Sequence, residues 1–244
     1  MVIKIGIAED CAGLCTATSS AEKYLQDANC FNVRGHEVVI QHLHASEIDD
    51  LLRSIIKKRY TFLNVSKRAQ DRGLTVLRKK LKLPFKDDDM DIYVNGFPCQ
   101  PFSRIGSKGG IKDERTEPLK VISSFVQENL PKVVVLEQVK HFTSKTFKDV
   151  RRHLLRKVKA IKWMTKKKSV SLYHIKETIL DTSKVICPSV PYAPGQSRLR
   201  YYLVALRKDI KTLQCFKPPK QDGPMLPLKS ILGDVSASNE KKKI

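Results

Sequence analysis

The chain has 244 residues, of which 41% are hydrophobic, so it is long enough and apolar enough to form a globular domain with its own core. No apolar run approaches the ~20 residues of a membrane-spanning helix, and the N-terminal segment is too short and too strand-like for a signal peptide, so we expect neither a membrane protein nor a secreted one. Lys and Arg number 46 against 25 Asp and Glu, and the net charge of +21 predicts a polyanionic partner, with nucleic acid favoured over an acidic membrane face.

Apolar, β-branched segments alternate with segments of helical spacing along the chain. Strands are predicted over residues 2–8, 37–43, 91–94, 132–136, 170–180 and 201–206. Helices are predicted over residues 16–25, 47–58, 118–129 and 146–161. The alternation predicts an α/β domain with a mostly parallel sheet and helices on both faces. We assign residues 1–235 to this domain and expect residues 236–244 to form a frayed basic tail.

The first predicted strand leads into a turn that contains Gly13, and a helix follows. This order is the general nucleotide-binding arrangement, although a single glycine is also what an ordinary turn contains. Ser46 is predicted to cap the next helix, with Asp49 completing a capping-box-like pattern. Glu47 follows the second strand, where a carboxylate can hold ribose hydroxyls; as an alternative, it complements the dipole of the helix that begins there.

A thiol follows the third predicted strand. Gly96 and Pro98 force the chain out of that strand, and Cys99 is the first residue presented after the break. Open α/β sheets bind their ligands at this edge, although a buried structural cysteine is the alternative. Residues 103–116 are rich in Gly, Lys and Ser and predict a polar loop able to close over the site.

Charged side chains follow the later strands. Glu137 comes after a continuous apolar run, and Arg198 and Arg200 are two residues apart, which places them on one side of an extended chain. Residues 146–161 have an apolar stripe on one side and a stripe of positively charged side chains on the other. This pattern predicts either a solvated surface or direct contact with nucleic acid. His42, His44 and Cys30 have no second ligand pair at zinc spacing, so no metal site is expected.

Four segments resemble, in order, motifs of the cytosine-5 DNA methyltransferase family. The segment from Gly96 to Ser103, Gly-Phe-Pro-Cys-Gln-Pro-Phe-Ser, resembles the nucleophile motif and is highly specific. Asp10-Cys11-Ala12-Gly13-Leu14 resembles the first glycine turn, Leu136-Glu137-Gln138-Val139 the Glu-Asn-Val motif, and Gln196-Ser197-Arg198-Leu199-Arg200 the Gln-x-Arg-x-Arg motif. The resemblance covers about residues 2–234. Two positions differ, because Cys11 stands where an aromatic residue is usual and Gln138 where Asn is usual.

The resemblance implies a Rossmann-like fold and methyl transfer from S-adenosylmethionine to C5 of cytosine in DNA, through a covalent bond between Cys99 and C6. Glu137 would contact N3 of the base, Arg200 its O2, and Arg198 would order the pocket and Glu137. The implied cofactor contacts are Asp10, Cys11, Ala12, Gly13, Leu14, Glu47, Gly96 and Pro98, and the implied substrate contacts are Gln100, Ser103 and Gln196. The target base would be flipped out of its duplex or already single-stranded.

Two other functions remain open from the sequence. One is the same chemistry on tRNA, and the other is a catalytically weak nucleic-acid-binding remnant or regulatory subunit. The family's target-recognition region and final motif are not evident in the chain, so a partner chain supplying them is a further expectation. We expect a nuclear location in a eukaryote and a cytoplasmic one otherwise, consistent with six cysteines that form no CxxC pair.

Overall fold

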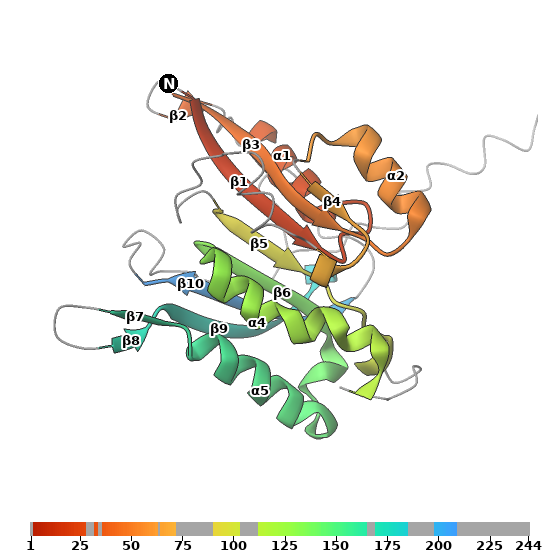
Figure 1. The fold of residues 1–244 in the computed structure, drawn as a ribbon, viewed down its shortest axis with the longest axis vertical. Helices are drawn as coiled ribbons and strands as arrows, with labels where there is room; N and C mark the ends of the chain where they lie inside the picture. Colours follow the sequence, from red (N-terminus) through yellow and green to blue (C-terminus); the bar gives the residue numbers. More distant parts are fainter. Residues whose placement is uncertain are drawn as a thin grey trace, which may run out of the picture.

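The computed structural model describes residues 2–27, 32–33, 36–62, 64–71, 90–102, 112–164, 169–184 and 198–208. It contains an eight-stranded sheet in the order β2-β3-β1-β5-β6-β10-β9, with β4 pairing with β3 (Figure 1). Its strands are β1 (Val2–Asp10), β2 (Asn32–Val33), β3 (His36–Ser46), β4 (Asn64–Ser66), β5 (Ile92–Asn95), β6 (Val133–Val139), β9 (Tyr173–Asp181) and β10 (Leu199–Arg207). A separate hairpin pairs β7 (Lys162–Met164) with β8 (Ser169–Ser171).

The centre of the sheet is parallel, with antiparallel pairing of β2 at one side and of β10 and β9 at the other, while β4 pairs with β3 in parallel. β1 pairs in parallel with β3 and β5, and β5 pairs in parallel with β6. β10 runs antiparallel to both β6 and β9. The parallel strands therefore present their carboxyl ends at one edge, the place where open α/β sheets bind ligands.

Helices cover both faces of the sheet, as the alternating sequence predicts. α1 (Thr16–Asp27) packs behind β1 and β3, whereas α4 (Glu117–Asn129) and α5 (Lys148–Lys159) lie on the near side, with α4 in front of β6 and α5 against β9 (Figure 1). The core between the sheet and these two helices is apolar and includes Phe125, Leu136 and Leu203. The fourth helix, α2 (Asp50–Arg59), lies beside β4.

Three predicted boundaries are wrong. Ser46 does not cap α2, because it continues β3, paired with Asp10 of β1. Asp49 is the N-cap instead, and its carboxylate accepts a hydrogen bond from Leu52 N at 2.9 Å. Glu137 lies inside β6 rather than after it, because pairing with β10 continues to Val139.

The third wrong boundary is the single strand expected over residues 170–180. It is divided between β8 and β9, which belong to different sheets. Among the described residues no helix has the length and apolarity needed to cross a bilayer. The expected tail at 236–244 and the end of the domain at 235 lie outside the described residues.

Candidate active site

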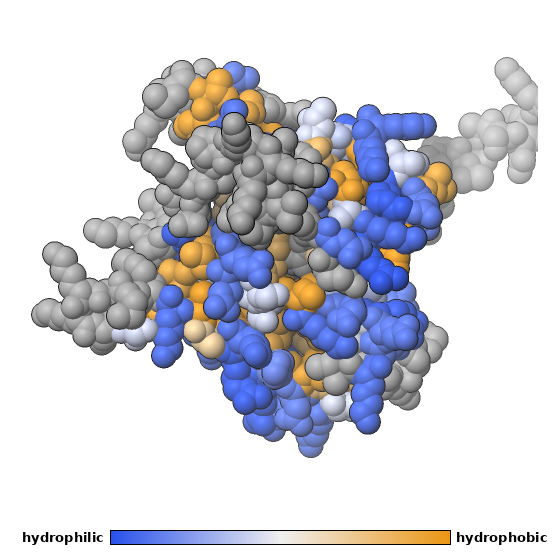
Figure 2. Space-filling model, in the orientation of Figure 1, coloured by the Kyte–Doolittle hydropathy of each residue, from blue (hydrophilic) through white to orange (hydrophobic). Residues whose placement is uncertain are grey.

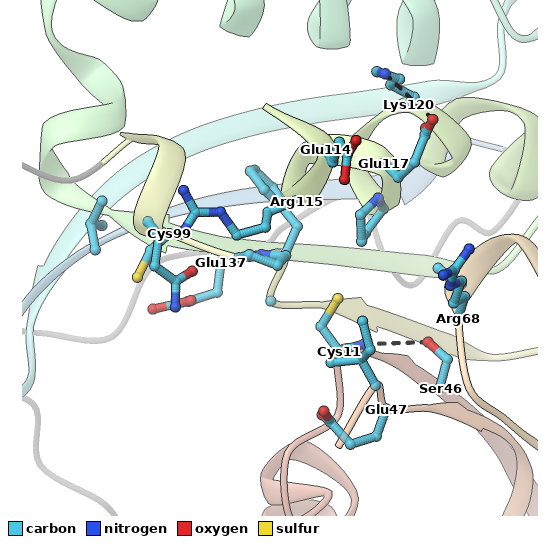
Figure 3. Close-up of a pocket in the computed structure, with 18 of the residues that line it drawn as sticks. Cys11, Ser46, Glu47, Arg68, Cys99, Glu114, Arg115, Glu117, Lys120 and Glu137 are labelled. Carbon is cyan, nitrogen blue, oxygen red and sulfur yellow. Dashed lines mark hydrogen bonds and ion pairs between the residues drawn. The ribbon is translucent and has the colours of Figure 1, made fainter. Parts of the chain in front are cut away.

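A pocket of about 1040 Å³ opens at the carboxyl edge of the parallel strands. Two walls are distinct: Cys99 and Glu137 lie together on one side, and Cys11, Ser46 and Glu47 lie on the other (Figure 3). The pocket lies at the upper end of the size range of small-molecule sites. Its charged lining residues are mostly cationic: Lys67, Arg68, Lys112, Arg115, Lys120, Arg198 and Arg200, against Glu47, Glu114, Glu117 and Glu137.

The half-buried Cys99 lies in a loop held by aromatic side chains. The short 3-10 helix Gln100–Phe102 follows it, and Phe102 N donates to the Cys99 carbonyl at 2.9 Å. Phe97 and Phe102 are buried with ring centroids 5.8 Å apart, and both pack against Phe142. The thiol is therefore presented at the pocket by a loop whose flanking side chains are fixed in the core.

The acid lies next to this loop because β5 and β6 are paired. A Cβ placed on Gly96 would be 3.8 Å from Glu137 Oε2, so the backbone of the Cys99 loop approaches the carboxylate closely. Glu137 and Arg200 form an ion pair with Oε1 and Nε 2.8 Å apart. Tyr202 is directly opposite Glu137 in the register, which puts Arg200 diagonally across the same face, within reach of a long side chain.

Burial raises the pKa of Glu137, and the guanidinium groups of Arg200 and Arg198 oppose that rise only in part. A carboxyl in this state takes up a proton more readily than an exposed glutamate does, as a group that shares a proton with a base requires. Both arginines line the pocket, and their predicted roles toward the base stay predictions. Arg200, rather than Arg198, makes the direct contact with Glu137, while Arg198 N donates to Asp181 at 3.1 Å.

Gln138 points away from the pocket and ties β6 to the Cys99 loop. Its side chain is 1% exposed, its Nε2 donates to the Phe97 carbonyl at 3.0 Å, and its Oε1 accepts from Val139 N at 2.8 Å. At this position, where the family usually has Asn, the amide therefore both donates and accepts a hydrogen bond. The additional methylene is accommodated, and Gln138 positions the loop that carries Cys99.

The opposite wall is built from the turn after β1. Cys11 and Gly13 have φ of 53° and 55°, in the left-handed region that favours glycine. The turn is held by the end of β3, because Ala12 N donates to the Ser46 carbonyl at 2.9 Å and Gly13 N to Glu47 Oε2 at 2.7 Å. The N–H group of Gly13 is therefore already bonded to a side chain.

Glu47 is placed where a ribose-binding carboxylate is expected. Its two oxygens accept from Gly13 N and, at 3.0 Å, from Asp49 N, which fixes the plane of the carboxylate at the pocket wall. Each carboxylate oxygen has two lone pairs, so both retain the capacity to accept a hydroxyl. Its alternative role in the first turn of α2 does not fit, because the helix begins at Asp50.

Asp10 faces the core rather than the pocket, which differs from the expected cofactor contact. It is 1% exposed, and its two oxygens accept hydrogen bonds from Ser46 Oγ and Tyr93 Oη, each at 2.6 Å. Asn95 Nδ2 donates to the same Tyr93 oxygen at 2.8 Å, and His44 Nε2 lies 3.4 Å from Asp10. This buried network supports the two strand ends on which Ser46 and the Cys11 turn depend.

The remaining predicted residues divide into three groups. Gly96, Pro98 and Gln100 line the pocket with Cys99, as expected. Ala12 is buried beside Cys15, and Leu14 is exposed outside the pocket lining, so neither side chain is placed at the site. Ser103 and Gln196 lie outside the described residues.

Two lining residues, Ile48 and Arg68, were not predicted from the sequence, whereas Arg115 belongs to the segment 103–116 that was predicted to close over the site. Ile48 is 66% exposed beside Glu47 and offers an apolar surface at the rim of the pocket. Arg68 follows β4 on the same side, and Arg115 approaches Cys99 while paired with Asp113 at 2.6 Å (Figure 3). For Ile48, its position directly after the predicted cofactor contact Glu47 was the one feature of the sequence that could have indicated a place at the site. Arg68 reaches the site through tertiary structure alone.

Known proteins that are similar to this chain are methyltransferases. Residues 30–244 match the family model of the C-5 cytosine-specific DNA methylases, a match that begins after the Cys11 turn. The chain is 33% identical over 132 residues to the Type II methyltransferase M.HhaI of Haemophilus parahaemolyticus, covering 54% of this chain and 35% of that protein. It is 30% identical over 126 residues to a Rattus norvegicus tRNA (cytosine(38)-C(5))-methyltransferase, covering 51% of this chain and 27% of that protein.

Solved structures share the fold. A variant of Spodoptera frugiperda DNMT2 superposes with a TM-score of 0.53 at 23% identity, covering 91% of this chain and 55% of that one. The Entamoeba histolytica methyltransferase EhMeth superposes with a TM-score of 0.51 at 16% identity, covering 91% and 57%. The chain thus spans about half of these structures and a smaller share of the curated relatives. The predicted Rossmann-like methyltransferase fold is confirmed, and the chain belongs to the C-5 cytosine-specific DNA methylase family.

Proposed function

We propose that the chain transfers a methyl group from S-adenosylmethionine to C5 of a flipped cytosine in DNA, through a covalent adduct of Cys99. The observation that carries the proposal is the shared pocket: the half-buried thiol and the Glu137–Arg200 pair form one wall, and the Glu47 turn forms the other. This separation provides one wall for a base and one for a nucleoside-containing donor.

The cofactor side would hold S-adenosylmethionine through Glu47 and the apolar surface of Ile48. The carboxylate of Glu47, fixed by two backbone N–H groups, would accept the ribose hydroxyls, and Ile48 would lie against the adenine ring. When bound, this donor supplies a methyl group on a positively charged sulfur. Gly96 and Pro98 lie between the two walls, close to where the donor and the base would meet.

The base side would activate cytosine toward that methyl group. The Cys99 thiolate adds to C6, and Glu137 gives a proton to N3 as negative charge develops on the ring. C5 would then take the methyl group, which leaves S-adenosylhomocysteine as a neutral thioether. Loss of the C5 proton to a base would break the C6–sulfur bond and release the Cys99 thiolate, and the proton on N3 would return to Glu137. Arg200 contributes by holding Glu137 and by offering its remaining N–H groups to O2 of the base.

Trapping on 5-fluorocytosine tests this proposal, because a fluorine at C5 cannot leave as a proton does. We expect a DNA duplex containing 5-fluorocytosine to form a covalent complex that survives denaturing gels, requires S-adenosylmethionine and is abolished by Cys99→Ser. Cys11→Ser is the matched control, since that thiol lies on the opposite wall, and it should retain trapping. A wild-type protein that binds S-adenosylmethionine yet traps no nucleic acid would contradict the covalent step.

The tRNA reaction is the second candidate, and the 30% identity to the rat tRNA enzyme favours it. The same protein is given tritiated S-adenosylmethionine with duplex DNA or with tRNA. Incorporation into DNA supports the leading proposal, and incorporation into tRNA alone replaces it. Salt-sensitive DNA binding without incorporation into either substrate would favour the nucleic-acid-binding remnant.

A further inference from the structure

The outer face of α5 carries a continuous cationic surface that the pocket chemistry does not use. Its exposed cations are Lys148, Arg152, Arg156, Lys157 and Lys159, here called the α5 cationic face. The opposite side of the helix is anchored in the core by the buried Leu154 and Val158. Hydrophilic side chains gather over this part of the molecule in the space-filling view (Figure 2). The face is therefore fixed in orientation and presented outward.

The cations in the first half of α5 are unfavourable for the helix itself. Lys148, Arg152 and Arg156 follow each other at four-residue spacing, so that like charges are neighbours on one row and repel. Lys148 also stands in the first turn, where a cation opposes the helix dipole. Within the described part of the chain, the ion pair that reaches this row is Arg152–Asp149 at 3.8 Å, and its aspartate side chain is 96% exposed. In the last turn, Arg156, Lys157 and Lys159 complement the helix dipole, so local stability explains that end of the face but not Lys148 and Arg152.

Arg151, on the adjacent position, shows what a structural arginine looks like in this helix. It points inward, where its Nη1 donates to the Phe142 carbonyl at 3.3 Å and its Nε lies 3.4 Å from Glu177. Arg152 and Arg156 make no comparable contact among the described residues, and both are exposed. On this helix, Arg151 therefore serves the packing of the protein, whereas Arg152 and Arg156 are available to a ligand in solution.

The face begins at the edge of the sheet where the pocket opens. β6 contributes Glu137 and Val139 to the pocket, and two short 3-10 helices, Lys140–Thr143 and Lys145–Phe147, connect it directly to α5. From there α5 runs back along the sheet for about 16 Å, at 1.5 Å per residue (Figure 1). A polymer with one unit in the pocket can thus follow this face with its neighbouring units.

We propose that the α5 cationic face binds the phosphate backbone of the nucleic acid outside the target nucleotide. Phosphate suits the face, because guanidinium groups bind it through paired hydrogen bonds and lysines act as point charges. An acidic bilayer fits less well, since none of the exposed large hydrophobic side chains among the described residues belongs to α5. The inference depends on the proposed function only for the identity of the polymer in the pocket.

The salt dependence of DNA binding tests this surface directly. Each phosphate contact adds about 0.9 to the slope of log K against log salt on B-DNA. The variant Lys148→Gln/Arg152→Gln/Arg156→Gln should therefore lose about 3 units of slope, so that its loss of affinity between 50 and 200 mM salt is about 40-fold smaller than that of the wild type. Fluorescence anisotropy with a labelled duplex, without S-adenosylmethionine, gives both slopes.

A second variant controls for total charge. Lys4→Gln/Lys57→Gln/Lys58→Gln also lowers the net charge from +21 by three, but changes exposed residues on β1 and α2. It should retain the wild-type slope, and thermal unfolding should show that the α5 variant is no less stable than the wild type. Equal slopes for the α5 variant and the wild type, or an equal fall in both variants, would overturn the inference.

Two further measurements distinguish this inference from membrane binding and from the proposed methyl transfer. Loss of binding to phosphatidylserine vesicles by the α5 variant, with DNA binding unchanged, would assign the face to a membrane and refute the proposal. Trapping on 5-fluorocytosine is scored independently. If the protein binds DNA through α5 but never traps it, this inference holds and the proposed function is refuted. If it traps DNA but the α5 variant keeps the wild-type slope, the proposed function holds and this inference is refuted.

Discussion

Replacing Gln138 by leucine isolates the contribution of one buried amide to the position of Cys99. Leucine has a similar size and fits the apolar surroundings, but it removes the hydrogen bonds to the Phe97 carbonyl and to Val139 N. Val139 is half-buried, so water can replace its partner, whereas Phe97 is 2% exposed. Leaving one buried carbonyl without a partner costs about 1–3 kcal/mol, which is the loss expected for Gln138→Leu.

The assay has a stability arm and a kinetic arm. In a domain of this size, each kcal/mol lowers the melting temperature by roughly 2–4 °C, so circular dichroism should show a fall of between about 2 and 12 °C. Because Phe97 is two residues from the nucleophile, methyl transfer under saturating S-adenosylmethionine should slow by about 10–100-fold. The KM for S-adenosylmethionine should change little, since Gln138 does not touch the pocket wall formed by the Cys11 turn.

Gln138→Asn is the matched comparison. It keeps the amide and shortens the side chain by one methylene, so it should lose less stability and less activity than leucine. If Gln138→Leu is as stable and as active as the wild type, the amide does not hold the loop. If asparagine is more damaging than leucine, packing rather than hydrogen bonding determines the position of Cys99.

Three further predictions follow from buried groups. Because burial raises the pKa of Glu137, its protonated form is favoured by folding; that stability is present below the ordinary glutamate pKa and is lost as the pH rises through the raised value. Glu137→Gln should therefore resist urea better than the wild type at pH 7.5, with a smaller difference at pH 4.5, and a less stable variant at pH 7.5 would contradict this. Tyr93→Phe removes a hydroxyl that donates to Asp10 and should lower the free energy of unfolding by about 2 kcal/mol in urea titrations; an unchanged midpoint would show that the network is dispensable. Burial, together with the carboxylates of Glu9 and Glu47, raises the pKa of Cys15 to about 12, so iodoacetamide at pH 8 should label Cys99 but not Cys15 until urea is added, and equal native labelling of the two would refute the assignment.

The strands of the site are predictable from the sequence because each is a short apolar run ended by turn residues. β1, β5, β6 and β10 all lie within a few residues of their expected positions. The errors arise where a distant partner extends a strand. Pairing with Asp10 draws Ser46 into β3, and pairing with β10 draws Glu137 into β6, although neither segment carries a local signal of these contacts.

The contacts between side chains are also not predictable from local sequence when the partners are far apart along the chain. The segment around Cys99 resembles the family's nucleophile motif, and the structure places Cys99 at the pocket. Nothing in the sequence indicates that Asp10 is bound by a tyrosine 83 positions away, which turns an expected ligand contact into a buried support. Likewise, alternation puts Arg198 and Arg200 on one side, but only the pairing with β6 determines which of them meets Glu137.

The antiparallel pairing of β6 with β10 makes the Glu137–Arg200 contact a check on strand alignment. A slip of one residue would turn every side chain of β10 to the wrong face and would be rejected by the core. A slip of two residues would keep the apolar side inward, yet it would move the guanidinium about 7 Å along the strand. Such a misaligned chain would look folded by circular dichroism while lacking its ion pair, so catalytic competence reports on a folding error that bulk spectroscopy would miss.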